Sequence, residues 1–392
     1  MNLTLYSSLS LVPTEIQFDK KSYIVEDKVS GEFYEMPEVC IAAIKLINSG
    51  LTLGKIEDQL KDIYPNEEVN LLDFAEQLLE MELVAEVNGV KVDKKKKEQE
   101  NQGYLSISPQ LGKFFFNKIA YFVYAALFFL NVIFFIVYPA LFPKYKDLFI
   151  FHYMFLNIPA WMVISFILVL IHEFGHVLAM RAFNLPARIE MGHRLFFVVL
   201  ETDMTSVWKL PSKDRNILYL AGLCFDTVIL SLALIAQQLL NGYSEFFLRI
   251  MSIIVLDTFI RMVYQCCIYM KTDLYYVFEN ISGCYNLMES AQQQIRKHIP
   301  FLKPAAKEEV VYDEERGTVL TYSIFYFFGA GVTILLFFTY YLPQLVYACR
   351  KVLPGFSQGT ASAPFWDAVI FTLQFLLVLS LLFFSWKKKY SH

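Results

Sequence analysis

The chain has 392 residues, of which 56% are hydrophobic, 17% aromatic and only 18% charged. This composition is too apolar for an ordinary soluble protein and predicts a helical membrane protein. The six cysteines form no CxxC pair and no zinc-finger spacing, so we expect free thiols that pack as small hydrophobes. Residues 1–10 lack the basic segment of a secretory signal, and we expect no signal peptide.

Residues 1–93 have the character of a small soluble domain. Two β-type runs within 17–25 predict a hairpin, and 32–34 would add a third strand. Three helical patterns follow, over residues 37–48, 53–63 and 71–81. A second hairpin is predicted over 83–92, because Asn88-Gly89 is a favoured two-residue turn. The order of elements predicts an α+β winged-helix-like domain.

The charge of this domain limits what it can bind. Residues 1–93 hold 7 Lys and no Arg against 18 Asp and Glu, a net charge of −11. Binding to a phosphate backbone needs a basic surface, so we expect no nucleic-acid partner. An exposed strand edge can instead take up an extended peptide through main-chain hydrogen bonds, which favours a peptide-docking role.

A basic and polar linker, residues 94–116, leads to the membrane part. Six hydrophobic stretches each approach the roughly 20 apolar residues that cross a bilayer as a helix. They cover about 119–142, 155–183, 215–240, 244–270, 319–343 and 366–386. The sequence thus predicts a polytopic α-helical protein with a membrane core over 117–300 and two further spans in 301–392, in contact with the lipid bilayer.

The stretch 184–214 is too mixed to be a span and is predicted to be a hairpin beside the second span. Orientation follows from the Lys and Arg of the loops. With a cytosolic N-terminus, the cytosolic segments carry 21 Lys and Arg and the opposite side carries 5. We therefore predict a multi-pass protein of the plasma membrane with both termini in the cytosol.

The motif His172-Glu173-Phe174-Gly175-His176 lies inside the second predicted span. A charged group near the bilayer centre costs at least about 2.5 kcal/mol, so such clusters persist where they bind something. Positions i and i+4 share a helix face, so His172 and His176 can reach one metal ion. Glu173 is placed to take a proton from a metal-bound water. The pattern predicts an intramembrane zinc protease.

A catalytic zinc site uses three protein ligands, so a third ligand must lie elsewhere in the chain. The candidates are Asp203, Asp226, Asp257, Asp273, His152 and His193. The second and fourth predicted spans both run toward the cytosol, which places Asp273 at the depth of the two histidines. Asp273 is therefore the predicted ligand, and its alternative role is an interfacial ion pair with Lys271.

The remaining candidates are given other roles. Asp257 lies too near the bilayer middle, and its expected partner is Arg261, one helical turn later. Asp226 is either a support for a metal ligand or an interior polar group satisfied by its neighbours. His193 is expected on the hairpin surface and His152 on an outer loop.

With these residues in place, the chain resembles the site-2 protease family of intramembrane zinc metalloproteases. Within it, the peptide zinc metalloprotease branch is the more similar one. That likeness rests on Thr202-Asp203 with Trp208, Leu220-Ala221-Gly222, Asp273-Leu274-Tyr275-Tyr276 and Asn286-Leu287. Residues 1–93 are similar to the peptide-binding chaperone of pyrroloquinoline quinone biosynthesis. The closest likeness is to the membrane proteases of epimerised-peptide gene clusters.

The resemblance implies that His172, His176 and Asp273 hold Zn²⁺ and that Glu173 is the catalytic base. It implies cleavage of a ribosomally made, modified peptide precursor whose leader docks on residues 1–93. A radical-SAM modifying enzyme and a peptide ABC transporter are the other partners it implies. The chain departs from the family pattern at three places. It has Leu274 where the family usually has Gly, and Cys267-Ile268 where the family usually has Asn-Pro. It has Leu223 where the family usually has Pro.

Two other functions remain open at this point. The first is regulated proteolysis of a membrane-bound regulator such as an anti-sigma factor, although such proteases more often carry PDZ-like modules and none is evident. The second is a non-catalytic immunity or export protein that sequesters the peptide, which would not require an intact HEFGH motif.

Overall fold

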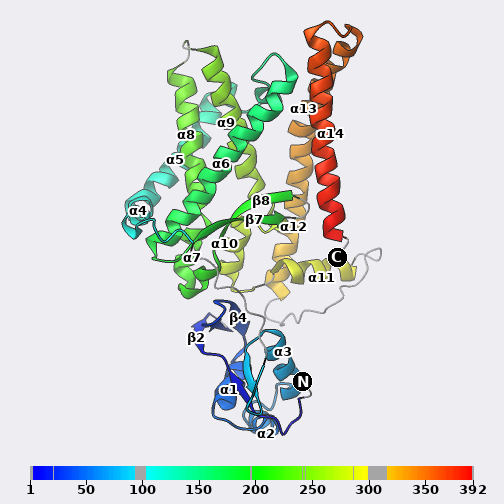
Figure 1. Cartoon of the computed structure of the whole chain (residues 1–392). Coiled ribbons are helices and arrows are strands. Elements are labelled where there is room, and N and C mark those ends of the chain that lie inside the picture. The colour runs from blue at the N-terminus through cyan, green and yellow to red at the C-terminus, as the bar shows by residue number, and fades with distance from the viewer. Residues whose placement is uncertain are drawn as a thin grey trace. The chain divides into compact units, whose positions relative to one another are not determined.

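The computed structural model describes residues 3–20, 22–92, 103–194, 197–240, 242, 244–285, 287–298 and 316–390. Linker residues up to 102, Asn286, residues 301–315 and the side chain of His193 lie outside this description. The chain divides into two compact units (Figure 1). Unit 1 comprises Met1–Gln102 with Thr205–Lys213, and unit 2 comprises Gly103–Met204 with Asp214–His392.

Unit 1 contains two antiparallel sheets and three helices. The first sheet has the strand order β2–β3–β4, from Thr14–Asp19, Ser22–Asp27 and Phe33–Met36. The second has the order β1–β5–β6, from Leu9–Leu11, Val84–Val87 and Val90–Lys91. The helices are α1 (Glu38–Asn48), α2 (Leu53–Ile63) and α3 (Leu71–Glu80). Both predicted hairpins and all three predicted helices are confirmed; β1 was not predicted.

Local sequence explains why these elements form. Leu53, Ile56 and Leu60 are fully buried and share one face of α2, as an amphipathic helix requires. Asn70 begins α3, because its side chain accepts hydrogen bonds from two backbone N–H groups of the first turn. The turn of the second hairpin has positive φ at Asn88 and Gly89, 52° and 77°, which is the geometry expected of an Asn-Gly turn.

Unit 2 is built from helices. Those that position the site are α5 (Lys118–Val137), α6 (Met154–Ala182), α8 (Ala221–Leu239), α9 (Glu245–Tyr264) and α10 (Asp273–Ser282). The others are α4 (Pro109–Phe115), α7 (Ser212–Tyr219), α11 (Leu287–His298), α12 (Arg316–Leu336), α13 (Leu342–Val352) and α14 (Ala363–Tyr390). Short helical turns complete the unit; one of them, η4 (Ile268–Met270), precedes α10.

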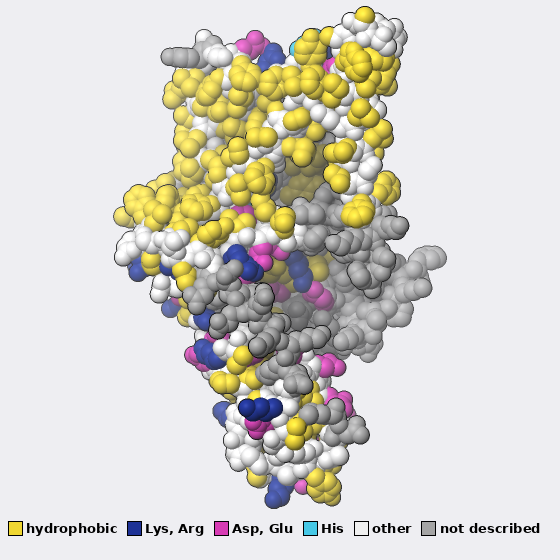
Figure 2. Space-filling model, in the orientation of Figure 1, with side chains coloured by type: hydrophobic (Ala, Val, Ile, Leu, Met, Phe, Trp, Pro, Cys, Tyr) yellow, Lys and Arg dark blue, Asp and Glu magenta, His cyan; other side chains and the backbone are white. Residues whose placement is uncertain are grey.

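Five helical segments of the described chain are long and apolar enough to cross a membrane. They are Lys118–Val137, Met154–Ala182, Ser212–Leu239, Gly317–Ser357 and Ala363–Leu381. These correspond to five of the six predicted spans. Hydrophobic side chains cover much of the face of this helical region that Figure 2 shows, as lipid contact requires. Phe122 and Ile136 of α5, for example, are 79% and 71% exposed.

The fourth predicted span, 244–270, is only partly confirmed. Its helix, α9, ends at Tyr264, six residues before the predicted end. Helix α9 is not one of the five segments apolar enough to cross a membrane, because it carries four charged residues: Glu245, Arg249, Asp257 and Arg261. Arg261 pairs with Asp257 at 3.2 Å, as predicted, so part of this charge is neutralised within the helix.

Helix α8 packs between its neighbours α5, α6 and α9, which lie side by side in Figure 1. Asn131 of α5 donates a hydrogen bond to the Thr227 carbonyl at 3.1 Å and accepts one from the Ser231 hydroxyl at 2.8 Å. Glycine permits close contact between α6 and α8, since a Cβ on Gly175 would lie only 2.8 Å from the Ala221 carbonyl oxygen.

The predicted hairpin at 184–214 is confirmed as β7 (Arg188–Arg194) and β8 (Phe197–Asp203). The two strands pair in antiparallel register from Arg188 opposite Asp203 to Arg194 opposite Phe197. Strand β8 lies against α6. The hairpin therefore brings main-chain groups beside the helix that carries the histidine motif.

Candidate metal centre

His172, His176 and Asp273 come together in the interior of unit 2 and could hold a metal ion. All three are buried. The two histidines lie one turn apart on α6, and Asp273 is the first residue of α10. Asp273 Oδ2 is 3.1 Å from His172 Nε2 and 3.4 Å from His176 Nε2, and the two Nε2 atoms are 3.4 Å apart.

This spacing fits a tetrahedral metal ion. Zinc bonds to nitrogen and oxygen are about 2.0–2.1 Å long, so a tetrahedral ion holds its ligand atoms about 3.3 Å apart. The three separations observed lie within a few tenths of an ångström of that value. Two nitrogens and one oxygen leave a fourth position free, as catalytic sites require.

The second nitrogen of each histidine fixes the orientation of its ring. Nδ1 of His172 donates to Asp226 Oδ2 at 2.8 Å, and Nδ1 of His176 donates to the Leu218 carbonyl at 2.9 Å. A carboxylate and a carbonyl can only accept, so both Nδ1 atoms carry the proton. In a neutral imidazole, Nε2 then carries a lone pair that faces Asp273, which is the tautomer that metal binding needs. Asp226 therefore contacts one of the two histidines that could hold a metal ion, and its role as a support for a metal ligand stays a prediction.

Asp273 is held by a residue that sequence analysis did not identify. Gln265 donates through Nε2 to Asp273 Oδ2 at 3.1 Å, and its Oε1 accepts from the Asp273 backbone N–H at 3.0 Å. The predicted alternative for Asp273 is wrong, because Lys271 pairs instead with Glu289 at 2.6 Å. Gln265 follows directly after α9, so the end of that helix at Tyr264 helps to place the carboxylate.

Glu173 follows His172 on α6 and is 8% exposed. Its Oε2 atom accepts two hydrogen bonds from Thr202 of β8, from the backbone N–H and from the hydroxyl, both at 2.8 Å. No hydrogen bond from the described residues reaches Oε1. One oxygen of the carboxylate is thus fixed by the hairpin and the other remains available for a proton.

Among the described residues, the other candidates do not belong to this group. Asp203 ends β8 opposite Arg188, and Asp257 pairs with Arg261. His152 precedes α6, and its ring packs against Tyr153. All six cysteines are free, as expected.

Gly222 leaves room for the Nε2 atom of His172. A Cβ built on Gly222 would overlap His172 Nε2 and its neighbouring ring atoms. We expect Gly222→Ala to lower zinc affinity by about 10-fold or more, since forcing an extra methyl group into a packed site costs about 1–3 kcal/mol. Chelator competition on the purified protein measures this affinity. Gly331→Ala is the control, because no atom lies within 4 Å of that Cβ; equal losses in both variants would contradict the prediction.

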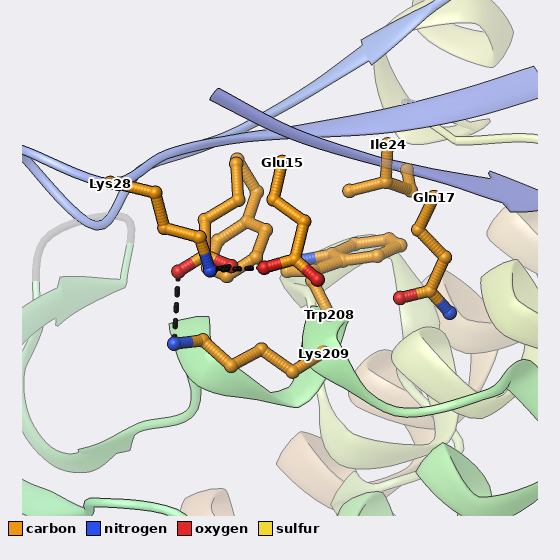
Figure 3. A pocket seen from close by; sticks show the side chains of 8 residues that line it. Glu15, Gln17, Ile24, Lys28, Trp208 and Lys209 are labelled. Atoms are coloured by element: carbon orange, nitrogen blue, oxygen red, sulfur yellow. Dashed lines mark hydrogen bonds and ion pairs between the residues drawn. The ribbon is translucent and has the colours of Figure 1, made fainter. Parts of the chain in front are cut away.

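A second polar cluster lies within unit 1. Glu15 of β2 and Lys28, which follows β3, line a pocket together with Trp208 and Lys209 of the short helix η3 (Thr205–Lys209) (Figure 3), and Glu26 of β3 lines it too. Glu26 binds Lys28 at 2.8 Å and Lys209 at 2.9 Å, and Lys28 also contacts Glu15. These ion pairs attach the segment that follows β8 in the sequence to the sheet.

Acid should weaken this cluster. Burial alone would raise the pKa of Glu26, but hydrogen bonds and charges from Lys28 and Lys209 outweigh it and lower that pKa. A carboxylate with a lowered pKa stabilises the fold above its unfolded pKa, and this contribution is lost as pH falls through the folded value. We expect Glu26→Gln to cost about 1 kcal/mol or less at pH 7. The melting-temperature difference from wild type should shrink below about pH 4.3; a constant difference down to pH 3 would contradict this.

Comparison with known proteins gives no match, whether with protein-family models, with curated proteins or with solved structures. The family resemblance of the sequence therefore stays a prediction. What the site can do is argued below from its own residues.

Proposed function

We propose that the protein is an intramembrane zinc metalloprotease that matures a ribosomally made, post-translationally modified peptide by removing its leader. The observation that carries this proposal is the tetrahedral spacing of the His172, His176 and Asp273 side-chain atoms, with the buried Glu173 next to His172 on the same helix. Nitrogen and carboxylate ligands together suit zinc better than calcium or magnesium, which prefer oxygen alone.

Each residue of the site has its own role in peptide hydrolysis. When bound, Zn²⁺ lowers the pKa of a water molecule toward about 7 and polarises the scissile carbonyl. Glu173 takes a proton from the attacking water through Oε1 and delivers it to the leaving amine as the C–N bond breaks. Thr202 keeps the other carboxylate oxygen in place throughout. The products are a carboxylic acid and an amine, so atoms balance with one water consumed.

The substrate must reach this site in an extended conformation, because a helical backbone hides its carbonyl groups. The β7–β8 hairpin supports such binding, since the Thr202 N–H places β8 main chain beside Glu173. Residues 1–93 would dock the leader through a strand edge and raise the local substrate concentration by tethering. Their net charge of −11 favours a leader with basic character.

The cellular setting is part of the proposal. The loop charges favour a plasma-membrane protein with cytosolic termini, so the precursor would approach from the cytosol. A radical-SAM enzyme would modify the peptide and an ABC transporter would export the product.

The test uses the full-length protein in lipid nanodiscs with a candidate precursor peptide that carries its leader. We expect a defined cleavage detected by mass spectrometry, its loss on treatment with a zinc chelator, and its recovery when Zn²⁺ is added back. Cleavage that persists undiminished in excess chelator, or a protein that binds no zinc, would overturn the metalloprotease proposal.

A further inference from the structure

A line of polar side chains runs behind His172, on the side away from the candidate metal-binding atoms, and passes from the buried Asp226 to the half-buried Arg261 and Asp257. Asp226 of α8 accepts from His172 Nδ1 at 2.8 Å, and its other oxygen lies 3.7 Å from Arg261 Nε of α9. Arg261 Nη2 binds Asp257 Oδ2 at 3.2 Å, and Asp257 Oδ1 accepts from Trp161 Nε1 at 3.1 Å. The line therefore begins and ends on α6.

The two ends of this line are far apart along α6. Trp161 and His172 are 11 residues apart in sequence, which is about 16 Å along a helix axis. Helices α8 and α9 supply the residues between them, and both lie beside α6 (Figure 1). The contacts thus connect three helices to the orientation of one imidazole ring.

Three ionisable groups in such surroundings are costly. Asp226 is 1% exposed, and the side chains of Asp257 and Arg261 are 11% and 17% exposed. Each buried ion loses several kcal/mol of hydration, and such groups within membrane helices are usually functional. Fold stability alone does not explain them, because apolar residues of similar size would pack there at no such cost.

We propose that Asp226 and Arg261 are positioning residues for the metal ligand His172, with Asp257 anchoring Arg261. Asp226 holds Nδ1 so that Nε2 points at the ion, in the way that outer carboxylates orient zinc-binding histidines. Arg261 acts one step further out, by fixing the second oxygen of Asp226. This inference rests on the metal centre of the proposed function and not on the identity of its substrate.

The geometry indicates how Arg261 acts. Its contact with Asp226 is an ion pair at 3.7 Å rather than a short hydrogen bond, so charge matters more than the shape of the guanidinium. A lysine ammonium would occupy nearly the position of the guanidinium carbon and keep that charge. Methionine would fill the space without charge and leave the Asp226 oxygen free to rotate away from His172.

The experiment measures zinc affinity of the full-length protein by chelator competition and the visible spectrum after Co²⁺ substitution, which reports ligand geometry. We expect Asp226→Ala to lower zinc affinity by about 10–100-fold, as loss of an outer partner of a metal ligand does. Arg261→Met should lower it by about 10-fold, and Arg261→Lys should stay near wild type. Both weakened variants should shift the Co²⁺ spectrum.

A double-mutant cycle separates positioning from general packing. If Arg261 acts through Asp226, then Arg261→Met should add almost nothing in the Asp226→Ala background. Asn131→Ala is the matched control, because it removes a buried polar contact of α8 that does not reach His172. Equal losses from Arg261→Met in both backgrounds, or an equal loss from Asn131→Ala, would overturn the inference. Tight zinc binding without cleavage of any peptide would contradict the proposed function and leave this inference standing.

Discussion

Replacing Glu173 with glutamine is expected to lower the rate of peptide cleavage by about 10²–10⁴-fold, the usual contribution of a positioned general acid–base. The amide has the size and shape of the carboxylate, and its oxygen can still accept the Thr202 hydrogen bonds. It cannot take a proton from water. Because Glu173 is not among the three ligand residues, zinc affinity should stay within a few-fold of wild type.

The measurement pairs single-turnover cleavage of the precursor with zinc content of the same preparation. Glu245→Gln serves as the matched control, since this glutamate lies exposed at the start of α9 and pairs with Arg249 at 2.7 Å. It should cleave like wild type. Wild-type cleavage by Glu173→Gln would show that another group moves the proton, and loss of zinc would show that Glu173 binds the metal itself.

Unit 1 could be predicted from the sequence because its signals are local. Asn88-Gly89 specifies a two-residue turn by its own backbone preference, and Leu53, Ile56 and Leu60 mark a helix face within eight residues. Strand β1 was missed because three residues carry too little pattern, and it forms only by pairing with β5, more than 70 residues later. Long-range pairing has no local signature.

That His172, His176 and Asp273 come together could be predicted, because two of them share a helix face and topology restricted the third. The residues that hold them in place could not. Thr202 meets Glu173 across 29 residues, and the Leu218 carbonyl that orients His176 is a main-chain atom with no sequence signal. Gln265 was missed because the fourth span was expected to continue to residue 270, whereas α9 ends at Tyr264 and exposes the Gln265 amide to Asp273.

Of the two ion pairs that Arg261 of α9 makes, one could be predicted from the sequence and the other could not. The i,i+4 pair of Asp257 and Arg261 is a local pattern and was predicted. The contact of Arg261 with Asp226 joins two helices and could not be read from spacing. It also explains why α9, a helix with four charged residues, packs among apolar helices, since Arg261 of α9 contacts a residue that binds His172.

Replacing Asp273 with alanine is expected to lower zinc affinity by more than about 100-fold, beyond the range for an outer partner of a metal ligand. The change removes one of three ligand atoms, and its oxygen lies within 3.4 Å of both histidine nitrogens. Gln265→Ala keeps the carboxylate but removes its side-chain hydrogen-bond partner, so its loss should be smaller, about 10-fold. Chelator competition on both variants measures the two losses of zinc affinity and shows which is larger.

Lys271→Ala is the matched control for Asp273, since Lys271 lies two residues earlier, between η4 and α10. Lys271 binds Glu289 rather than Asp273, so its removal should leave zinc affinity unchanged. If Asp273→Ala instead keeps wild-type affinity, the third ligand lies elsewhere and the tetrahedral spacing of these three atoms has another cause. If Lys271→Ala weakens zinc as strongly as Asp273→Ala, the loop before α10 acts as a whole, and the ligand role of the carboxylate is not supported.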